Sequence, residues 1–190
     1  MEKSYWDNRY LQGETQWDIG APSPALTHYL DNHAQKNMAI LIPGCGHAYE
    51  ADYLLQQGFE NVSLIDISEI AVNHLFQKYA SQNHSIQIFC EDFFAHQGQY
   101  DLILEQTFFC ALLPERRPEY VQKMHALLKP AGRLVGVFYN RDFEGGPPFG
   151  GSQKEYEKLF SEKFKKLQLA PCAHSIKPRQ GSELFLIAEK

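Results

Sequence analysis

The residues best suited to hold a ligand lie where a short apolar run meets a glycine-rich turn. Ile40-Leu41-Ile42 leads into Pro43-Gly44-Cys45-Gly46, and a helical pattern follows from Tyr49. Glycines at such a turn let the backbone approach a ligand closely, because they carry no Cβ and accept positive φ. Asp66 ends the next apolar run, at about the twenty-residue spacing from which an acidic residue reaches a nucleoside ribose. Together the two features predict a nucleoside-like ligand, whereas the glycines alone would also fit an ordinary tight turn.

The turn favours a ligand without phosphates. Ala48 and Tyr49 stand where a dinucleotide site would have a third glycine, which lets the helix lie close under a pyrophosphate. S-adenosylmethionine has no phosphate, and its sulfonium prefers carbonyl oxygens, carboxylates and aromatic faces. An NAD-linked oxidoreductase would share the sheet and the acidic residue, and it stays the rival interpretation. We predict S-adenosylmethionine as the cofactor, held by Pro43, Gly44, Cys45, Gly46, Asp66 and Ile67.

Two further strand ends carry side chains suited to this ligand. Asp92 follows an apolar run and precedes Phe93 and Phe94, so it would accept the adenine amino group while the ring of Phe93 or Phe94 packs on the base. Its alternative role is a helix N-cap beside core phenylalanines. Glu105 and Gln106 end the next run and would lie beside the reactive centre, where Glu105 would contact the cofactor. The alternative for this pair is a strand end that faces solvent.

A parallel sheet would bring these strand ends together, and the apolar pattern predicts one. Alternating apolar runs and amphipathic stretches give the rhythm of βαβ units. The expected strands cover residues 38–42, 62–65, 86–90, 100–104, 133–139, 164–169 and 183–188, and the expected helices cover 49–57, 69–79, 118–128 and 152–160. The last two strands leave no room for a crossover helix and must pair antiparallel. We expect an α/β fold, a doubly wound and mostly parallel seven-stranded sheet with an antiparallel last strand.

Composition limits the classes of partner. The chain has 190 residues, 44% of them hydrophobic, and we expect residues 1–190 to form one domain. A net charge of −5 without a long basic run argues against nucleic acid and anionic membranes. No apolar stretch approaches the ~20 residues of a membrane span, and no apolar leader begins the chain. The four cysteines and eight histidines show neither a CxxC pair nor metal-ligand spacing. We expect a cytoplasmic monomer or weak oligomer without a metal.

Five blocks lie in order along nearly the whole chain. They are Trp6-Asp7-x-x-Tyr10-x-x-Gly13-x-Thr15-x-Trp17-Asp18, Pro43-Gly44-Cys45-Gly46, Asp66-Ile67-Ser68, Phe108-Phe109-Cys110-Ala111 and Gly146-Pro147-Pro148-Phe149. These blocks resemble the thiopurine S-methyltransferase family, which includes halide and thiol methyltransferases. The resemblance implies a class I methyltransferase fold of the Rossmann-like type, S-adenosylmethionine as donor, and a small soft acceptor such as a thiol, a thiopurine, a halide or a metalloid oxyanion.

The resemblance also implies that the N-terminal segment, residues 1–37, folds over the cofactor. Trp6, Tyr10 and Trp17 would then cover the ligand and exclude water. The alternative is that Trp6 and Tyr10, spaced i, i+4, form the apolar stripe of an amphipathic helix.

The residues expected around the acceptor supply little charge. Gln106 stands where thiopurine-specific members of the family carry an arginine, and we predict that Gln106, Phe109, Tyr139 and Phe149 bind the acceptor. Arg179 would either reach the same pocket or lie in a solvated turn. In-line methyl transfer needs alignment and dehydration more than a base, and a thiol or a halide is already partly or fully ionised at neutral pH. We therefore predict a thiol or halide acceptor. A thiopurine, a tellurite or selenium acceptor, and a cofactor-binding protein without activity are the alternatives.

Overall fold

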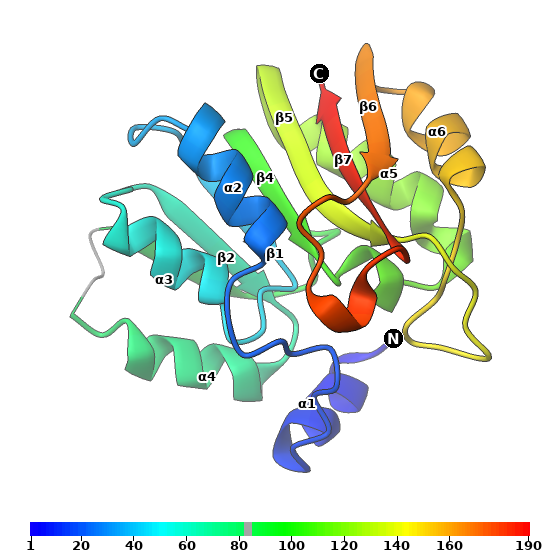
Figure 1. Ribbon diagram of the computed structural model, residues 1–190. Coiled ribbons are helices and arrows are strands. Elements are labelled where there is room, and N and C mark those ends of the chain that lie inside the picture. Colours follow the sequence, from blue (N-terminus) through cyan, green and yellow to red (C-terminus); the bar gives the residue numbers. More distant parts are fainter. Residues whose placement is uncertain (82–84) are drawn as a thin grey trace.

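The computed structural model describes residues 1–81 and 85–190, and a seven-stranded sheet runs through it (Figure 1). The strands are β1 (Ile40–Pro43), β2 (Val62–Asp66), β3 (Ile86–Cys90), β4 (Tyr100–Gln106), β5 (Leu128–Tyr139), β6 (Lys166–Pro171) and β7 (Glu183–Glu189). Their order across the sheet is β3-β2-β1-β4-β5-β7-β6. The pairs from β3 to β5 are parallel, whereas β7 runs antiparallel to both β5 and β6. The predicted fold class is confirmed.

Helices cover both faces of this sheet (Figure 1). They are α1 (Lys3–Leu11), α2 (Pro24–His33), α3 (Tyr49–Gln56), α4 (Glu69–Lys78), α5 (Arg117–Leu127) and α6 (Gln153–Ser161), with short 3₁₀ turns η1 (Phe109–Ala111), η2 (Pro114–Arg116) and η3 (Lys177–Arg179). One apolar layer joins α2, α3 and α4 to the sheet, and a second joins α5 and α6 to its other face. Strand residues alternate between these layers: Leu41 lies in the second, and its neighbours Ile40 and Ile42 lie in the first.

Local sequence explains where several helices start. Ser68 caps α4, since its hydroxyl accepts a hydrogen bond from Ala71 N at 3.3 Å. Ser152 caps α6 in the same way, accepting from Glu155 N at 3.4 Å in a Ser-x-x-Glu pattern. Pro24 occupies the first turn of α2, where a missing N–H costs nothing. Among the described residues, none of the helices has the length and apolarity that crossing a bilayer requires.

The structure adds two helices to those that the sequence predicts. α1 has no fully buried residue, and it corresponds to the alternative in which Trp6 and Tyr10 lie on one face of a helix. α2 buries Leu26 and Leu30 against the sheet. The expected lid of residues 1–37 therefore divides in two: the segment up to Trp17 reaches the cavity described below, and α2 belongs to the sheet's covering layer.

β5 is longer than the predicted strand 133–139. Leu128 pairs with Tyr100, and the regular register then resumes with Arg133 opposite Leu102. The extra residues between them form an irregular bulge in which Ala131 has φ 61°. Residues 129–132, which separate the predicted helix from the predicted strand, are thus part of β5. β6 is also displaced, beginning at Lys166, where the prediction began at residue 164.

Candidate active site

A cavity of about 360 Å³ lies at the carboxyl ends of the parallel strands. Its wall draws residues from the segments that follow β3, β2, β1, β4 and β5, which are neighbours in that order across the sheet. The strand order reverses between β1 and β4, and such switch points are where doubly wound sheets bind ligands. The predicted site residues that line the cavity are Trp6, Tyr10, Trp17, Gly44, Asp66, Ile67, Asp92, Phe93 and Tyr139.

The two glycines of the turn after β1 stand at positions that have no room for a side chain. Gly44 and Gly46 have φ of 57° and 52°, which a residue with a Cβ rarely adopts. A Cβ on Gly44 would lie 2.4 Å from the ring of Phe108, and one on Gly46 would lie 2.9 Å from the Tyr10 hydroxyl. The turn is therefore closed on both sides by aromatic residues, and its backbone forms part of the cavity wall at Gly44.

Asp66 holds this turn in place. Its carboxylate accepts hydrogen bonds from Gly46 N at 3.0 Å and from Ser68 N at 2.9 Å. The side chain is buried at the carboxyl end of β2, and this burial raises the pKa of Asp66 above its usual value. Asp66 also lines the cavity, so the same carboxylate can shape the glycine turn and accept a hydrogen bond from a ligand hydroxyl.

The segment after β3 supplies acidic and aromatic residues to the cavity wall. Phe93 is buried and meets Phe108 edge to face, with ring centroids 5.1 Å apart. Asp92 is exposed, and its carboxylate accepts from Phe94 N at 2.9 Å. Asp92 therefore caps a turn, whereas the alternative prediction made it the N-cap of a helix. It also lines the cavity. The neighbouring Glu91 lines the cavity as well and was not predicted.

Three aromatic residues of the N-terminal segment meet over the cavity. The ring of Trp17 contacts Trp6 and Tyr10 edge to face, at centroid distances of 5.4 and 5.8 Å. Trp6 and Tyr10 lie on α1 and also line the cavity. The two predictions, a helix and a segment that covers the cavity, are therefore compatible. Burial raises the pKa of the Tyr10 hydroxyl, which stays protonated at neutral pH.

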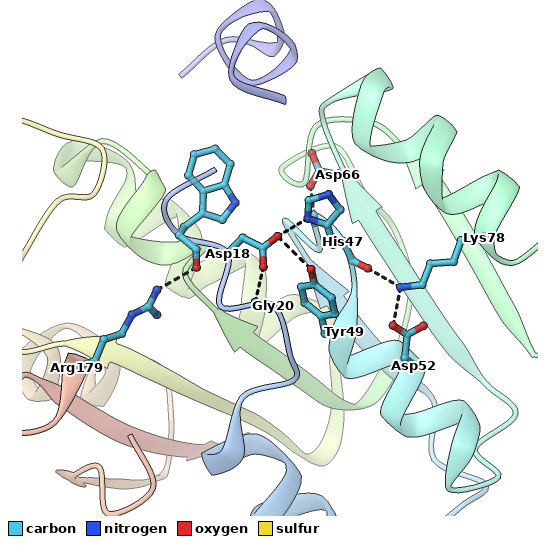
Figure 2. Close-up of polar contacts among 10 residues, drawn as sticks. Asp18, Gly20, His47, Tyr49, Asp52, Asp66, Lys78 and Arg179 are labelled. Atoms are coloured by element: carbon cyan, nitrogen blue, oxygen red, sulfur yellow. Dashed lines mark hydrogen bonds and ion pairs between the residues drawn. The ribbon is translucent and has the colours of Figure 1, made fainter. Parts of the chain in front are cut away.

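A polar cluster ties this segment to the glycine turn (Figure 2). Asp18 lies 2.7 Å from His47 Nδ1, and it accepts hydrogen bonds from Tyr49 Oη at 3.2 Å and from Gly20 N at 2.7 Å. We call Asp18, His47 and Tyr49 the clasp. Lys78 donates to the backbone oxygen of His47 at 2.8 Å and so fixes the clasp on α4. The N-terminal segment is thus fastened to the residue that directly follows the glycine turn.

Arg179 of η3 holds the same segment on the side of Trp17 that lies away from the clasp (Figure 2). Its Nη2 donates to the backbone oxygen of Trp17 at 3.0 Å, and its guanidinium lies 5.5 Å from the Tyr139 ring centre. Its Nη1 lies 3.6 Å from the carboxylate of Glu183. Arg179 therefore contacts two residues of the cavity wall without lining the cavity itself, and the alternative of a solvated turn residue does not fit its burial.

Four other predicted residues also lie behind the wall. Glu105 is fully buried and accepts hydrogen bonds within the protein. The Gln106 side-chain oxygen is buried without a hydrogen-bond partner among the described residues. Phe109 belongs to the core between β5, α5 and α6, and Phe149 packs over Gly146. Of the glycine turn, Gly44 lines the cavity, whereas Pro43, Cys45 and Gly46 do not. The cofactor or acceptor roles of these residues remain predictions.

The sequence did not predict several residues of the wall. They are Met1, Tyr5, Arg9, Gln16, Ile65, Glu91, Thr107, Phe108, Cys110, Ala111, Leu112, Arg116, Phe143, Pro147 and Pro148. Both arginines have acidic partners: Arg9 lies 3.4 Å from Glu14, and Arg116 lies 2.9 Å from Glu119. Among the described residues, no three His, Cys, Asp or Glu side chains are grouped to hold a metal ion.

Cys110 contributes a thiol to this wall. Its thiol is buried and donates to the backbone oxygen of Thr107 at 3.2 Å. Burial raises the pKa of the thiol to about 12, with the nearby Glu105 carboxylate as a second cause. Cys90, which the sequence placed in an apolar run, is exposed on the edge strand β3.

Known proteins resemble this chain in sequence and in fold. The family described as thiopurine S-methyltransferase matches residues 1–185. A probable thiol methyltransferase 2 of Arabidopsis thaliana is 34% identical over 94% of this chain and 81% of its own length. Thiocyanate methyltransferase 1 of Brassica oleracea is 32% identical over 96% of this chain and 83% of its own length.

A solved structure with the same fold is the 1,6-didemethyltoxoflavin-N1-methyltransferase of Burkholderia thailandensis, crystallised with 1,6-didemethyltoxoflavin and S-adenosylhomocysteine. The two chains align with a TM-score of 0.76 at 20% identity, over 99% of this chain and 86% of the other. At this identity the likeness shows the fold.

Proposed function

The chain belongs to the thiopurine S-methyltransferase family, and we propose that it transfers a methyl group to a thiol or a halide. It is a methyltransferase, and S-adenosylmethionine is its methyl donor. The observation that carries the proposal is the division of one cavity along the sheet. The wall on the β3-β2-β1 side contains Asp92, Asp66 and Gly44, and the wall on the β4-β5 side is formed mainly by apolar and aromatic residues.

The first half of the cavity fits the cofactor. Gly44 brings backbone to the cavity surface without a side chain, and Asp66 offers a carboxylate to the ribose hydroxyls. Asp92 would accept the adenine amino group, while Phe93 and Ile67 would pack against the base. Trp6, Tyr10 and Trp17 present aromatic faces that suit a sulfonium. When bound, the cofactor supplies an electrophilic methyl group.

The second half of the cavity fits a small soft nucleophile. Tyr139, Phe143, Pro147 and Pro148 make a wall without a formal charge, and Cys110 is a protonated thiol. Such surroundings remove water from an anion and raise its reactivity. The residues do not need to take a proton from an anion, so their contribution is to align the acceptor and to exclude solvent.

The acceptor is tested by comparing catalytic efficiency for iodide, hydrosulfide and a thiopurine. We expect hydrosulfide or iodide to exceed the thiopurine by roughly tenfold or more, about 1.4 kcal/mol of transition-state stabilisation. The reason is that the arginines of the wall already have acidic partners and leave a charged purine poorly compensated. Arg179→Ala should lower all three efficiencies together, since Arg179 supports Trp17 and Tyr139. A thiopurine preference in the parent, abolished in Arg179→Ala, would place the protein in the thiopurine branch instead.

The clasp is proposed to hold the lid, residues 1–20, over the bound cofactor. Asp18→Asn removes the charge that faces His47. We expect KM for S-adenosylmethionine to rise by roughly 1.4- to 5-fold, since a partly exposed pair contributes about 0.2–1 kcal/mol. Asp101→Asn is the matched control. Asp101 likewise accepts from a basic side chain and a backbone N–H, those of Lys129 and Ala39, at the amino ends of β4 and β1. Equal KM values in both variants would contradict a role for the clasp.

A further inference from the structure

Glu105 is a carboxyl group in a buried position, where an apolar side chain would lose less free energy of hydration. It has no exposed surface, and it stands at the end of β4 with Gly136 of β5 against its side chain. Four contacts satisfy its oxygens: Oε1 accepts from Phe108 N at 2.9 Å and Phe109 N at 3.1 Å, and Oε2 lies 3.2 Å from Phe109 N and accepts from Tyr120 Oη at 2.8 Å. A buried carboxylate needs such compensation.

The contacts of Glu105 act on the turn that begins the second half of the cavity. Thr107 starts this turn with φ 60°, which is unfavourable for a β-branched residue and needs support from its surroundings. The amides of the next two residues, Phe108 and Phe109, both point to the carboxylate. Thr107, Phe108 and Cys110 of this turn line the cavity, whereas Glu105 does not. Its effect on a ligand is therefore indirect.

The same turn reaches the cofactor half of the cavity through the ring of Phe108. This ring occupies the space beside Gly44 that a Cβ would need, at 2.4 Å, and it meets Phe93 with centroids 5.1 Å apart. A displacement of the Phe108 backbone would therefore move a side chain that contacts the glycine turn as well as the wall for the acceptor. The carboxyl group of Glu105 therefore acts, through the backbone of Phe108, on the walls of both halves of the cavity.

We infer that Glu105 is a positioning residue, which holds residues 107–112 so that the two halves of the cavity meet in the geometry for methyl transfer. The inference rests on the proposed function only for its activity readout. The carboxylate form suits this task best, since it accepts charge-assisted hydrogen bonds with both oxygens, whereas the protonated form must use one oxygen as a donor.

The protonation state of Glu105 changes within the neutral range. Burial raises the pKa of Glu105 to about 7, against the hydrogen bonds from Phe109, Tyr120 and Phe108, which lower it. The titratable groups that face it are Tyr120 from α5 and Cys110 from the turn itself, and burial keeps both protonated at neutral pH. The contact from β5 is Gly136, which carries no charge. The turn is accordingly held more firmly above about pH 7 than below it.

Glu105→Gln tests the inference, because the amide keeps the shape of the side chain and one acceptor oxygen but cannot ionise. We expect the parent to exceed Glu105→Gln in catalytic efficiency for iodide about fivefold at high pH, with the ratio approaching one at acidic pH, the order expected when charge-assisted hydrogen bonds become neutral ones. Iodide does not titrate in this range, and Asp66 is present in both proteins, so the ratio isolates Glu105. Tyr120→Phe should move the midpoint of the ratio to higher pH, since it removes a hydrogen bond that lowers the pKa of Glu105.

A second readout does not depend on activity. The amide proton shifts of Phe108 and Phe109 in the parent should follow one titration with a midpoint near 7, and this titration should vanish in Glu105→Gln. Glu50→Gln is the matched control, because Glu50 is also buried and accepts from a backbone amide, Ser23 N at 2.8 Å, away from the cavity. It should leave both readouts at parent values.

The outcomes separate this inference from the proposed function. A parent that methylates neither iodide nor a thiol contradicts the proposed function, and the amide titration together with S-adenosylhomocysteine binding then decides on Glu105. A ratio that stays flat with pH, or amides that do not titrate, overturns the inference even in a fully active enzyme. The same holds if Glu50→Gln reproduces the effect of Glu105→Gln.

Discussion

Asp66→Ala should weaken the binding of S-adenosylhomocysteine by about 1.5–3 kcal/mol, or roughly 10- to 150-fold in Kd. Two losses add together. The ribose hydroxyls lose a charged acceptor, and the amides of Gly46 and Ser68 lose the carboxylate that fixes the glycine turn. Calorimetry with the parent and the variant measures the change. Because burial raises the pKa of Asp66, affinity in the parent should begin to fall at a higher pH than an exposed aspartate would give.

The two losses can be separated with Asp66→Asn. This variant keeps an uncharged oxygen for one of the two amides, so it should lose less affinity than Asp66→Ala. The free energy of unfolding, followed for all three proteins, reports the part of the effect that belongs to the turn alone. A folded Asp66→Ala protein with parent affinity, or a parent that binds NAD more tightly than S-adenosylhomocysteine, would contradict the assignment of this carboxylate to the cofactor.

Deleting residues 1–20 should leave a folded protein that has lost about 10- to 100-fold or more in catalytic efficiency, since water then reaches the reacting atoms. Folding should survive because α1 buries none of its own residues. The main polar contact between α1 and the rest of the protein is made by Asp7, which accepts a hydrogen bond from Ser68 Oγ at 2.7 Å. Water can replace that contact. Circular dichroism and methyl transfer to a thiol measure the two properties.

A pair of point variants on the same helix gives the control for this deletion. Trp6 lines the cavity, whereas Leu11 is 67% exposed and faces away from it. Trp6→Ala should reproduce part of the loss, and Leu11→Ala should keep the efficiency of the parent. Full turnover in the truncated protein, or equal losses in the two point variants, would show that the segment is not a lid.

The sequence predicts the cofactor side of the cavity better than the acceptor side, and the reason is physical. Gly44, Asp66 and Asp92 each lie within two residues of the carboxyl end of a strand, so the sheet alone brings them together. In the turn after β4, by contrast, the left-handed conformation of Thr107 decides which of the next residues face the cavity. That conformation turns Phe109 into the core, where adjacent apolar residues look alike in sequence.

Long loops were also beyond prediction, because only tertiary packing brings them to the site. Pro147 and Pro148 line the cavity, whereas the prediction chose Phe149 from the same block. One alternative for Arg179 brings it into the pocket, whereas the structure places it against Trp17 and Tyr139 without lining the cavity. Its partner, the backbone oxygen of Trp17, lies 162 positions away in the chain. No local pattern encodes a contact of that kind.

The buried thiol of Cys110 bears on how a methyltransferase for soft nucleophiles would avoid modifying itself. A cysteine in the wall of the cavity proposed to bind the methyl donor is a potential competing nucleophile. With its pKa at about 12, Cys110 is ionised in roughly one molecule in 100,000 at pH 7, against about 3% of molecules for an ordinary thiol of pKa ~8.5. Its proton is further engaged by the backbone oxygen of Thr107. The fold thus keeps the Cys110 thiol of the cavity wall protonated, and therefore weakly nucleophilic.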